Sequence, residues 1–113
     1  MKIEGVTTEV MHYDVMIVLK NKDGISYATY AKGHYMGDIQ LQEKGDFCIE
    51  RAIELPEILS KGILYVDLYL HHPMVDFLLK APDCCKLETI GYQKGFGSVM
   101  NQVDNGFMGL LDF

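Results

Sequence analysis

The nine residues ILYVDLYLH at positions 63–71 alternate between two kinds of side chain. The even positions are all aliphatic: Leu64, Val66, Leu68 and Leu70. From position 65 on, the odd positions are aromatic, acidic or histidine: Tyr65, Asp67, Tyr69 and His71. Because successive side chains of a strand point to opposite faces, this period of two predicts a β-strand with one buried aliphatic face. The opposite face carries groups that can bind a ligand.

Two further segments show the same alternation. Residues 12–20 have apolar side chains at the odd positions: Tyr13, Val15, Ile17 and Leu19. Residues 46–55 alternate in the same way, and Pro56, which cannot donate to a ladder, ends that strand at Leu55. The stretch Asn21-Lys22-Asp23-Gly24 has the composition of a turn and predicts a hairpin between residues 12–20 and 25–31.

The rest of the chain has weaker patterns. Residues 32–44 predict a loop with a short edge strand, and residues 74–80 fit either a strand or a helical turn. Pro82-Asp83 precedes a strand over 84–90, and a glycine-rich loop beginning at Gly91 leads to a last strand over 107–113. We expect roughly five to seven strands and at most one short helix. Short connections favour an all-β fold, an antiparallel β-sandwich of the jelly-roll or immunoglobulin-like kind.

Composition narrows the class of protein. The 113 residues are 49% hydrophobic and 23% charged, which indicates one folded domain over 1–113. The longest uninterrupted apolar run, residues 15–19, is far shorter than the roughly 20 residues of a membrane-spanning helix. No basic and then apolar segment opens the chain, which favours a cytoplasmic protein. The net charge of -6 repels phosphate backbones, so we expect no nucleic acid partner.

The cysteines do not form a recognisable motif. Cys48, Cys84 and Cys85 are odd in number and include no C-x-x-C, which is unlike a secreted disulfide framework. We expect reduced, buried and unreactive thiols.

The histidines suggest a metal-dependent cupin as an alternative class of sandwich protein. The expected H-x-H with a nearby Glu is missing, and His71 and His72, as sequence neighbours, point to opposite faces of one strand. His12 and His34 complete the set. A G-x-x-x-x-G-K-[ST] phosphate loop is also missing, so the chain has no ATPase site of its own. We predict no metal, no cofactor and no catalysis.

The stretch LPEILSKGILYVDLYL, residues 55–70, resembles the L-P-x-L-x-x-G-x-Y-x-x-x-L-x-L core of one family. That family is the C-terminal domain of Wzt-type ATPase subunits in polysaccharide-export ABC transporters. Residues 14–24 are similar to its upstream strand and N-x-D-G hairpin, and the later Phe77, Pro82 and glycine-rich loop extend the resemblance over most of the chain. The family usually has a further strand before Lys2 and ends on Trp where Phe113 stands, so this chain resembles a truncated or excised C-terminal domain, or a separate small relative.

The resemblance implies a function as well as a fold. Members of the family are jelly-roll-like β-sandwiches that bind the exported polysaccharide, such as the O-antigen of lipopolysaccharide, often at its modified terminal end. The resemblance also implies a homodimer formed by exchange of an edge strand. The partners would be the transporter's membrane subunit and an ATPase domain, which would place the domain peripherally at the cytoplasmic side of the inner membrane.

The candidate carbohydrate-binding residues form two groups. The first is the polar face of residues 63–71, with Tyr65, Asp67, Tyr69 and His71 spaced about 6.6–6.8 Å apart by the rise of a strand. Aromatic rings stack on the C–H faces of sugars, while Asp and His pair with sugar hydroxyls. The second group lies near the predicted hairpin: Tyr27, Tyr30, His34 and Tyr35. Two alternatives stay open, because tyrosines favour strands for structural reasons and can also anchor a protein partner.

Overall fold

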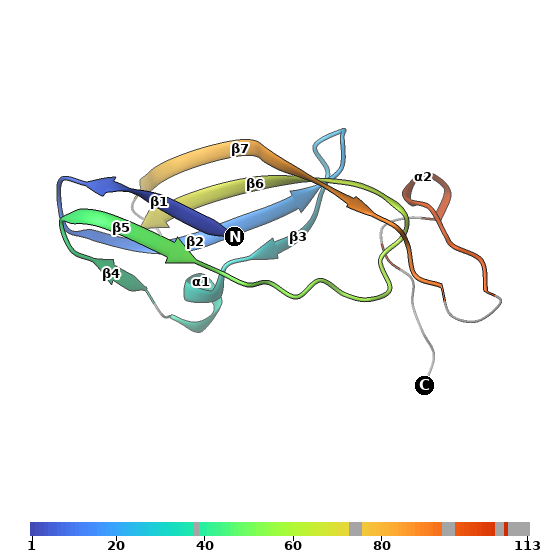
Figure 1. Cartoon of the computed structure of the whole chain (residues 1–113), viewed down its shortest axis with the longest axis horizontal. Coiled ribbons are helices and arrows are strands. Elements are labelled where there is room, and N and C mark those ends of the chain that lie inside the picture. The colour runs from blue at the N-terminus through green and yellow to red at the C-terminus, as the bar shows by residue number, and fades with distance from the viewer. Residues whose placement is uncertain (38, 73–75, 94–96, 106–107, 109–113) are drawn as a thin grey trace.

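The computed structural model describes residues 1–37, 39–72, 76–93, 97–105 and 108. The molecule is elongated, with extents of 55 × 29 × 23 Å (Figure 1). Its described strands are β1 (Lys2–Thr7), β2 (Met11–Lys20), β3 (Ser26–Tyr30), β4 (Gln40–Gln42), β5 (Gly45–Glu50), β6 (Gly62–His72) and β7 (Asp76–Thr89). Two short helices, α1 (Lys32–Met36) and α2 (Gln102–Asn105), complete the described elements.

The larger sheet has five strands. Strands β3, β2, β6 and β7 lie side by side in that order, and β4 also pairs with β2. Each pairing is antiparallel. In the central pair, Val15 lies opposite Leu70 and Leu19 lies opposite Val66. The aliphatic faces predicted for the two strands therefore coincide on one side of the sheet, which we call the inner face; the other side is the outer face.

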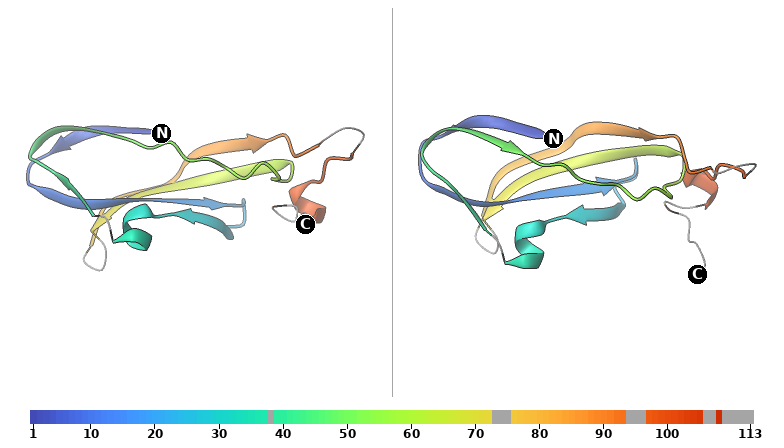
Figure 2. Two further views of the ribbon diagram at one scale, coloured as in Figure 1. Left: turned by 90° about the horizontal axis from the view of Figure 1, so that it is seen from below. Right: turned by 60° about the horizontal axis from the view of Figure 1, so that its bottom comes forward.

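The smaller sheet consists of β1 and β5. It covers part of the inner face, and α1 lies on the other side of β2 from it (Figure 2). Ile3, Phe47 and the buried Ile49 of this sheet pack against the side chains of the larger one. Among the described residues, nine buried side chains form the core on the inner face: Tyr13, Val15, Ile17, Leu19, Ile49, Leu64, Val66, Leu68 and Leu70.

The predicted all-β fold is confirmed, since two antiparallel sheets enclose the core. The hairpin predicted at residues 21–24 is confirmed by the pairing of β2 with β3. In its turn, Asn21 Oδ1 accepts hydrogen bonds from the N–H groups of Asp23 and Ile25, each over 2.9 Å. Gly24 has a φ of 82°, which a residue with a side chain rarely adopts. The jelly-roll or immunoglobulin-like connectivity stays a prediction.

The strand predicted over residues 46–55 is shorter than expected. β5 ends at Glu50, where its register with β1 ends. Two further hydrogen bonds follow: the Arg51 N–H donates to the Met1 carbonyl over 2.9 Å, and the Met1 ammonium donates to the Arg51 carbonyl over 2.8 Å. Ile53 and Leu55 continue the apolar alternation but pair with no strand in the described chain. Alternation shows which face is apolar, and it does not show where a partner strand stops.

The separation of residues 74–80 from 84–90 is also wrong for the described residues. β7 runs from Asp76 to Thr89 through Pro82 and Asp83. Its register against β6 shifts twice, once near Leu78 and once at Pro82 and Asp83, where Asp83 has a φ of 50°. Proline is tolerated at this point because β7 is an edge strand and the backbone there forms a bulge.

Other elements differ from the sequence analysis. β1 is an additional strand, and two short helices occur where at most one was expected. α1 lies within residues predicted as a loop, and it ends at Gly37, whose φ of 68° gives a left-handed cap. The strand predicted over 107–113 lies outside the described residues, except for Met108, which forms an isolated bridge with Leu59.

Replacing Leu64, which is 0% exposed, by Ala should lower the free energy of unfolding by about 2–5 kcal/mol, because a cavity is left in the core. Urea denaturation followed by circular dichroism measures the change. The matched control Leu41→Ala, at an exposed position of β4, should alter stability by no more than about 0.5 kcal/mol. Equal losses in the two variants would contradict the assigned core.

Candidate functional site

The outer face of β6 carries the four side chains predicted from residues 63–71. Their neighbours on β2, taken from position 65 to 71, are Lys20, Val18, Met16 and Asp14. On β7, Tyr65 pairs with Lys86, Tyr69 with Lys80 and His71 with Phe77. The predicted face is therefore the middle of a broad surface, with a strand on each side of it.

Asp67 has three partners on this surface. Its Oδ1 lies 3.1 Å from Lys20 Nζ and accepts a hydrogen bond from the Asp83 N–H over 2.7 Å. Its Oδ2 accepts a hydrogen bond from the Tyr69 hydroxyl over 3.3 Å. Lys20 Nζ also lies 3.1 Å from Asp83 Oδ1. Asp67 is buried, so it positions these groups and does not itself face solvent.

The bulge in β7 supplies the backbone donor for Asp67. Val66 pairs with Cys85 and Leu68 with Ala81, so residues 82–84 together lie opposite Asp67. The irregular backbone takes the Asp83 N–H out of the ladder and directs it to the carboxylate.

The charge states in this network follow from its contacts. Burial by itself raises the pKa of Asp67, but the Asp83 N–H and the Lys20 ammonium outweigh it and hold that pKa below its usual value. Hydrogen bonds to Asp67 and Asp83 raise the pKa of Lys20. Burial, and then the charge of Asp67, raise the pKa of the Tyr69 hydroxyl. At neutral pH Asp67 is thus ionised, Lys20 is protonated and Tyr69 is a neutral phenol.

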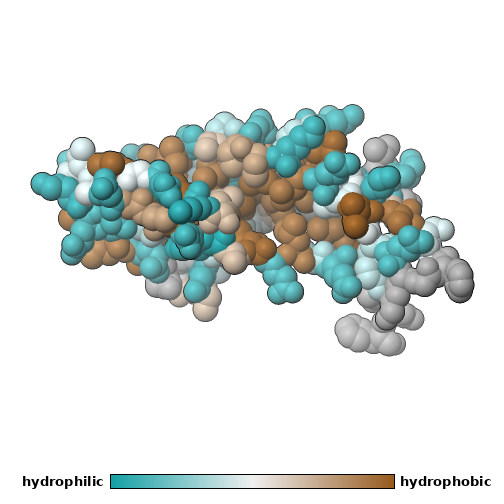
Figure 3. All heavy atoms as spheres, in the orientation of Figure 1, coloured by the Kyte–Doolittle hydropathy of each residue, from teal (hydrophilic) through white to brown (hydrophobic). Residues whose placement is uncertain are grey.

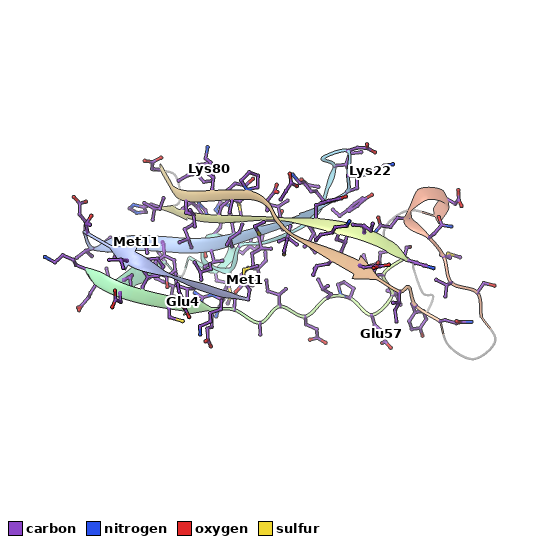
Figure 4. The ribbon with its side chains drawn as sticks, turned by 45° about the horizontal axis from the view of Figure 1, so that its top comes forward. Met1, Glu4, Met11, Lys22, Glu57 and Lys80 are labelled. Carbon is purple, nitrogen blue, oxygen red and sulfur yellow. The ribbon has the colours of Figure 1, made fainter. Side chains whose placement is uncertain are left out.

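Three rings gather beside this network. The ring centroids of Tyr69 and Phe77 are 5.6 Å apart, and those of His71 and Phe77 are 6.0 Å apart. Lys80 Nζ lies 4.6 Å from the Phe77 centroid, and its side chain extends outward from β7 (Figure 4). We call Tyr69, His71 and Phe77 the aromatic cluster.

Phe77 and Lys80 are site residues that the sequence analysis does not select. Residues 74–80 fit both a strand and a helical turn, and only the strand places these side chains on the face of Tyr69. The pairing of these residues with β6, which the sequence does not reveal, decides between the two.

Asp14 is a second buried carboxylate on the outer face, and the sequence analysis does not select it either. Its two oxygens accept hydrogen bonds from the N–H groups of Gly33 and His34 over 2.9 and 3.0 Å. Asp14 Oδ2 also lies 3.6 Å from His71 Nε2. An acidic residue within the otherwise apolar residues 13–19 is the signal that could have identified it. Asp14 connects the aromatic cluster to the backbone of α1, the helix that carries His34 and the exposed Tyr35.

Tyr30 lies apart from the other predicted site residues. It pairs with Ile17, whose side chain belongs to the core, so Tyr30 is on the inner face. Tyr27 and Tyr30 line a cavity of about 610 Å³ between that face and residues 51–56. The structure therefore gathers Tyr65, Asp67, Tyr69 and His71 on the outer face and separates Tyr30 from them.

The expectation of buried cysteines is wrong. Cys48, Cys84 and Cys85 are free and exposed. Cys84 and Cys85 lie on β7, an edge strand that is exposed along most of its length. Partial desolvation, and then the neighbouring Cys85 thiol, raise the pKa of Cys84, which keeps this thiol protonated at neutral pH.

The described histidines make separate contacts and do not form one cluster. His12 stacks on His72 with centroids 5.8 Å apart, while His71 faces Asp14. Among the described residues, no three histidine, cysteine or acidic side chains lie close enough to hold a metal ion. No helix in the described part of the chain is long and apolar enough to cross a membrane.

No protein-family model matches the sequence, and none of the curated proteins is significantly similar to it.

Replacing Asp67 by Asn should destabilise the protein at pH 7, because Lys20 and the β7 bulge lose an anionic partner. The pKa of Asp67 is lowered by folding, so its contribution is present above the unfolded pKa of about 3.9 and is lost as the pH falls below that value. The difference in Tm between wild type and variant should therefore narrow below about pH 4.

Thermal denaturation at a series of pH values measures this difference. Asp46→Asn, at an exposed position of β5, is the matched control and should leave Tm nearly unchanged throughout. A difference for Asp67→Asn that persists undiminished at low pH would show that the charge of Asp67 is not what stabilises the bulge.

Proposed function

We propose that this chain is a non-catalytic glycan-binding domain that recognises a polysaccharide for export by an ABC transporter. The aromatic cluster carries the proposal, since it places three rings on one open sheet face, with Phe77 44% exposed. The resemblance of residues 55–70 to the C-terminal domain of Wzt-type ATPase subunits supports it and names the class of ligand.

The aromatic cluster has the chemistry that a sugar ring needs. Phe77 presents ring surface on which the C–H groups of a sugar can stack. Because the Tyr69 hydroxyl donates its proton to Asp67, its oxygen is left to accept a hydrogen bond from a sugar hydroxyl. Lys80 adds a donor beside the same ring. Asp67 then acts as a positioning residue and not as a ligand contact.

The surface extends beyond the aromatic cluster. Tyr65 lies about 13 Å from Tyr69 along β6, by the rise of four strand residues, and pairs with Lys86 on the same face. An open, elongated surface of this kind suits a chain of sugars more than a single small molecule.

The two buried carboxylates of the outer face support a non-catalytic role. Asp67 is held by Lys20 and the Asp83 N–H, and Asp14 accepts hydrogen bonds from two N–H groups of α1. Each carboxylate is thus engaged in holding another element of the fold.

The proposed function also implies a location and partners in the cell. The domain would act at the cytoplasmic side of the inner membrane, held there by the transporter's membrane subunit and ATPase domain. A homodimer would present two glycan sites, and attachment of one repeating polysaccharide to both would raise the apparent affinity.

One observation favours a second candidate function, a protein-interaction module without sugar binding. The start of the edge strand β7 exposes three consecutive large apolar side chains, Phe77, Leu78 and Leu79, at 44%, 45% and 41%. A partner protein could cover them, and the aromatic cluster would then be its anchor.

NMR titration of the ¹⁵N-labelled protein with O-polysaccharide fragments, including their non-reducing ends, tests the glycan proposal. We expect saturable shifts around Tyr69, Phe77 and Lys80. Phe77→Ala should weaken binding by about tenfold, because the stacking surface is lost. Tyr69→Phe, which keeps the ring, should weaken binding less than Tyr69→Ala.

Tyr92→Ala is the matched aromatic control, because Tyr92 follows the opposite end of β7 from Phe77. It should bind like wild type. The absence of shifts at millimolar sugar would reject the glycan proposal, and a stable protein partner lost in Phe77→Ala would then establish the second candidate.

A further inference from the structure

The cavity that Tyr27 and Tyr30 line on the inner face takes no part in the proposed glycan binding. This cavity of about 610 Å³ lies between the larger sheet and residues 51–56, which we call the strap. The volume falls within the roughly 300–1,000 Å³ typical of ligand pockets.

The cavity exists because the smaller sheet is shorter than the larger one. β5 ends at Glu50, and its pairing with β1 ends there. The chain then runs on beside the larger sheet without a partner strand (Figure 1). Over this part of the inner face, the strap replaces a second sheet.

The lining is apolar on both sides. Leu19, Val66 and Leu87 line it from the larger sheet, and Ile53 and Leu55 line it from the strap. Apolar side chains are visible between hydrophilic ones in the middle of the face seen in Figure 3. Ile53 remains 38% exposed and Leu87 37% exposed. A ligand that covered them would gain from the removal of apolar surface from water.

The strap offers a route of entry. Arg51 exchanges two backbone hydrogen bonds with Met1, over 2.9 and 2.8 Å. Residues 52–56 form no hydrogen bond with any other described residue. Residues 52–56 can therefore move away from the sheet without breaking a described hydrogen bond, while Arg51 stays bonded to Met1.

Arg51 gives the cavity a positive charge at one end. It is half-buried and lines the cavity, and its Nη1 donates to the Glu50 carbonyl over 2.7 Å. No carboxylate of a described residue lies within ion-pair distance of it. Glu54 also lines the cavity and is exposed, which disfavours an anion at its own position. A single anionic head beside Arg51 complements this arrangement.

We infer that this cavity binds the alkyl chain of a long-chain carboxylate, with the carboxylate head beside Arg51. The apolar lining accepts the chain, and the guanidinium selects the head. This site lies on the inner face, opposite the aromatic cluster, and so does not depend on glycan binding.

Laurate below its micellar concentration, with 1-dodecanol as the uncharged probe, tests the inference by methyl NMR and calorimetry. We expect saturable shifts of the methyl groups of Ile53, Val66 and Leu87. A second readout uses Cys85, which lines the cavity. In the Cys48→Ser/Cys84→Ser protein, laurate should slow alkylation of Cys85 by N-ethylmaleimide by at least about tenfold, because the bound chain covers the thiol.

Substitutions in the cavity test the contacts of the alkyl chain and of the carboxylate head separately. Ala28→Phe places a ring in the cavity and should abolish binding of both probes, while Ala52→Phe, on the strap but outside the lining, should leave binding unchanged. Arg51→Gln should weaken laurate binding about tenfold and leave dodecanol binding unchanged. Arg51→Gln keeps the test decisive if Ala28→Phe does not fold. Phe77→Ala, on the outer face, should bind laurate like wild type.

Three results would overturn the inference. One is the absence of saturable shifts with laurate. Another is equal laurate binding by wild type and Arg51→Gln, which would show that Arg51 does not bind the carboxylate head. The third is a dimer, seen by light scattering, whose formation protects Cys85 without any probe, because a second copy would then occupy the cavity.

Discussion

The antiparallel pairing of β2 with β6 is the interaction on which the rest of the structure depends. It joins residues 14–20 to residues 65–71 in an unbroken register. Because the side chains alternate with a period of two, a shift by one residue would exchange the two faces of a strand. Such a shift would move Leu64 and Leu70 out of the core and bring Asp67 into it. Burial of the aliphatic side chains favours the observed register. The same register avoids the free-energy cost of burying the Asp67 carboxylate without partners.

The outer face is organised by two carboxylates at different positions along this pair. Asp14 holds the first turn of α1, and Asp67 holds the bulge of β7. Each accepts hydrogen bonds from the backbone of an element outside the pair, so a strand side chain positions a segment distant in sequence. The aromatic cluster lies between them, with Tyr69 bonded to Asp67 and His71 facing Asp14. The geometry of the proposed glycan site is thus fixed by groups that do not themselves touch the glycan.

Much of the fold could be predicted from side-chain periodicity alone. The inner faces of β2 and β6 and the turn after Lys20 follow directly from alternation and turn composition. The end of β5 and the continuity of β7 could not be predicted, because both depend on where a partner strand lies. The four site residues of β6 share a face as expected, whereas Phe77 and Asp14 join the site only through pairing across strands. Tyr30 is close to the hairpin in sequence, yet its pairing with Ile17 places it on the inner face.

The bulges of β7 affect how one copy of the molecule meets another. Long edge strands expose unpaired backbone groups that can recruit a strand from a neighbouring chain and start aggregation. In β7 the backbone is irregular near Leu78 and again at Pro82 and Asp83, and Pro82 has no N–H to donate. These irregularities divide a fourteen-residue edge into stretches too short to template a new strand efficiently. The same bulge that holds Asp67 thus helps to keep concentrated solutions of the protein free of edge-to-edge polymers, although the adjacent side chains are apolar.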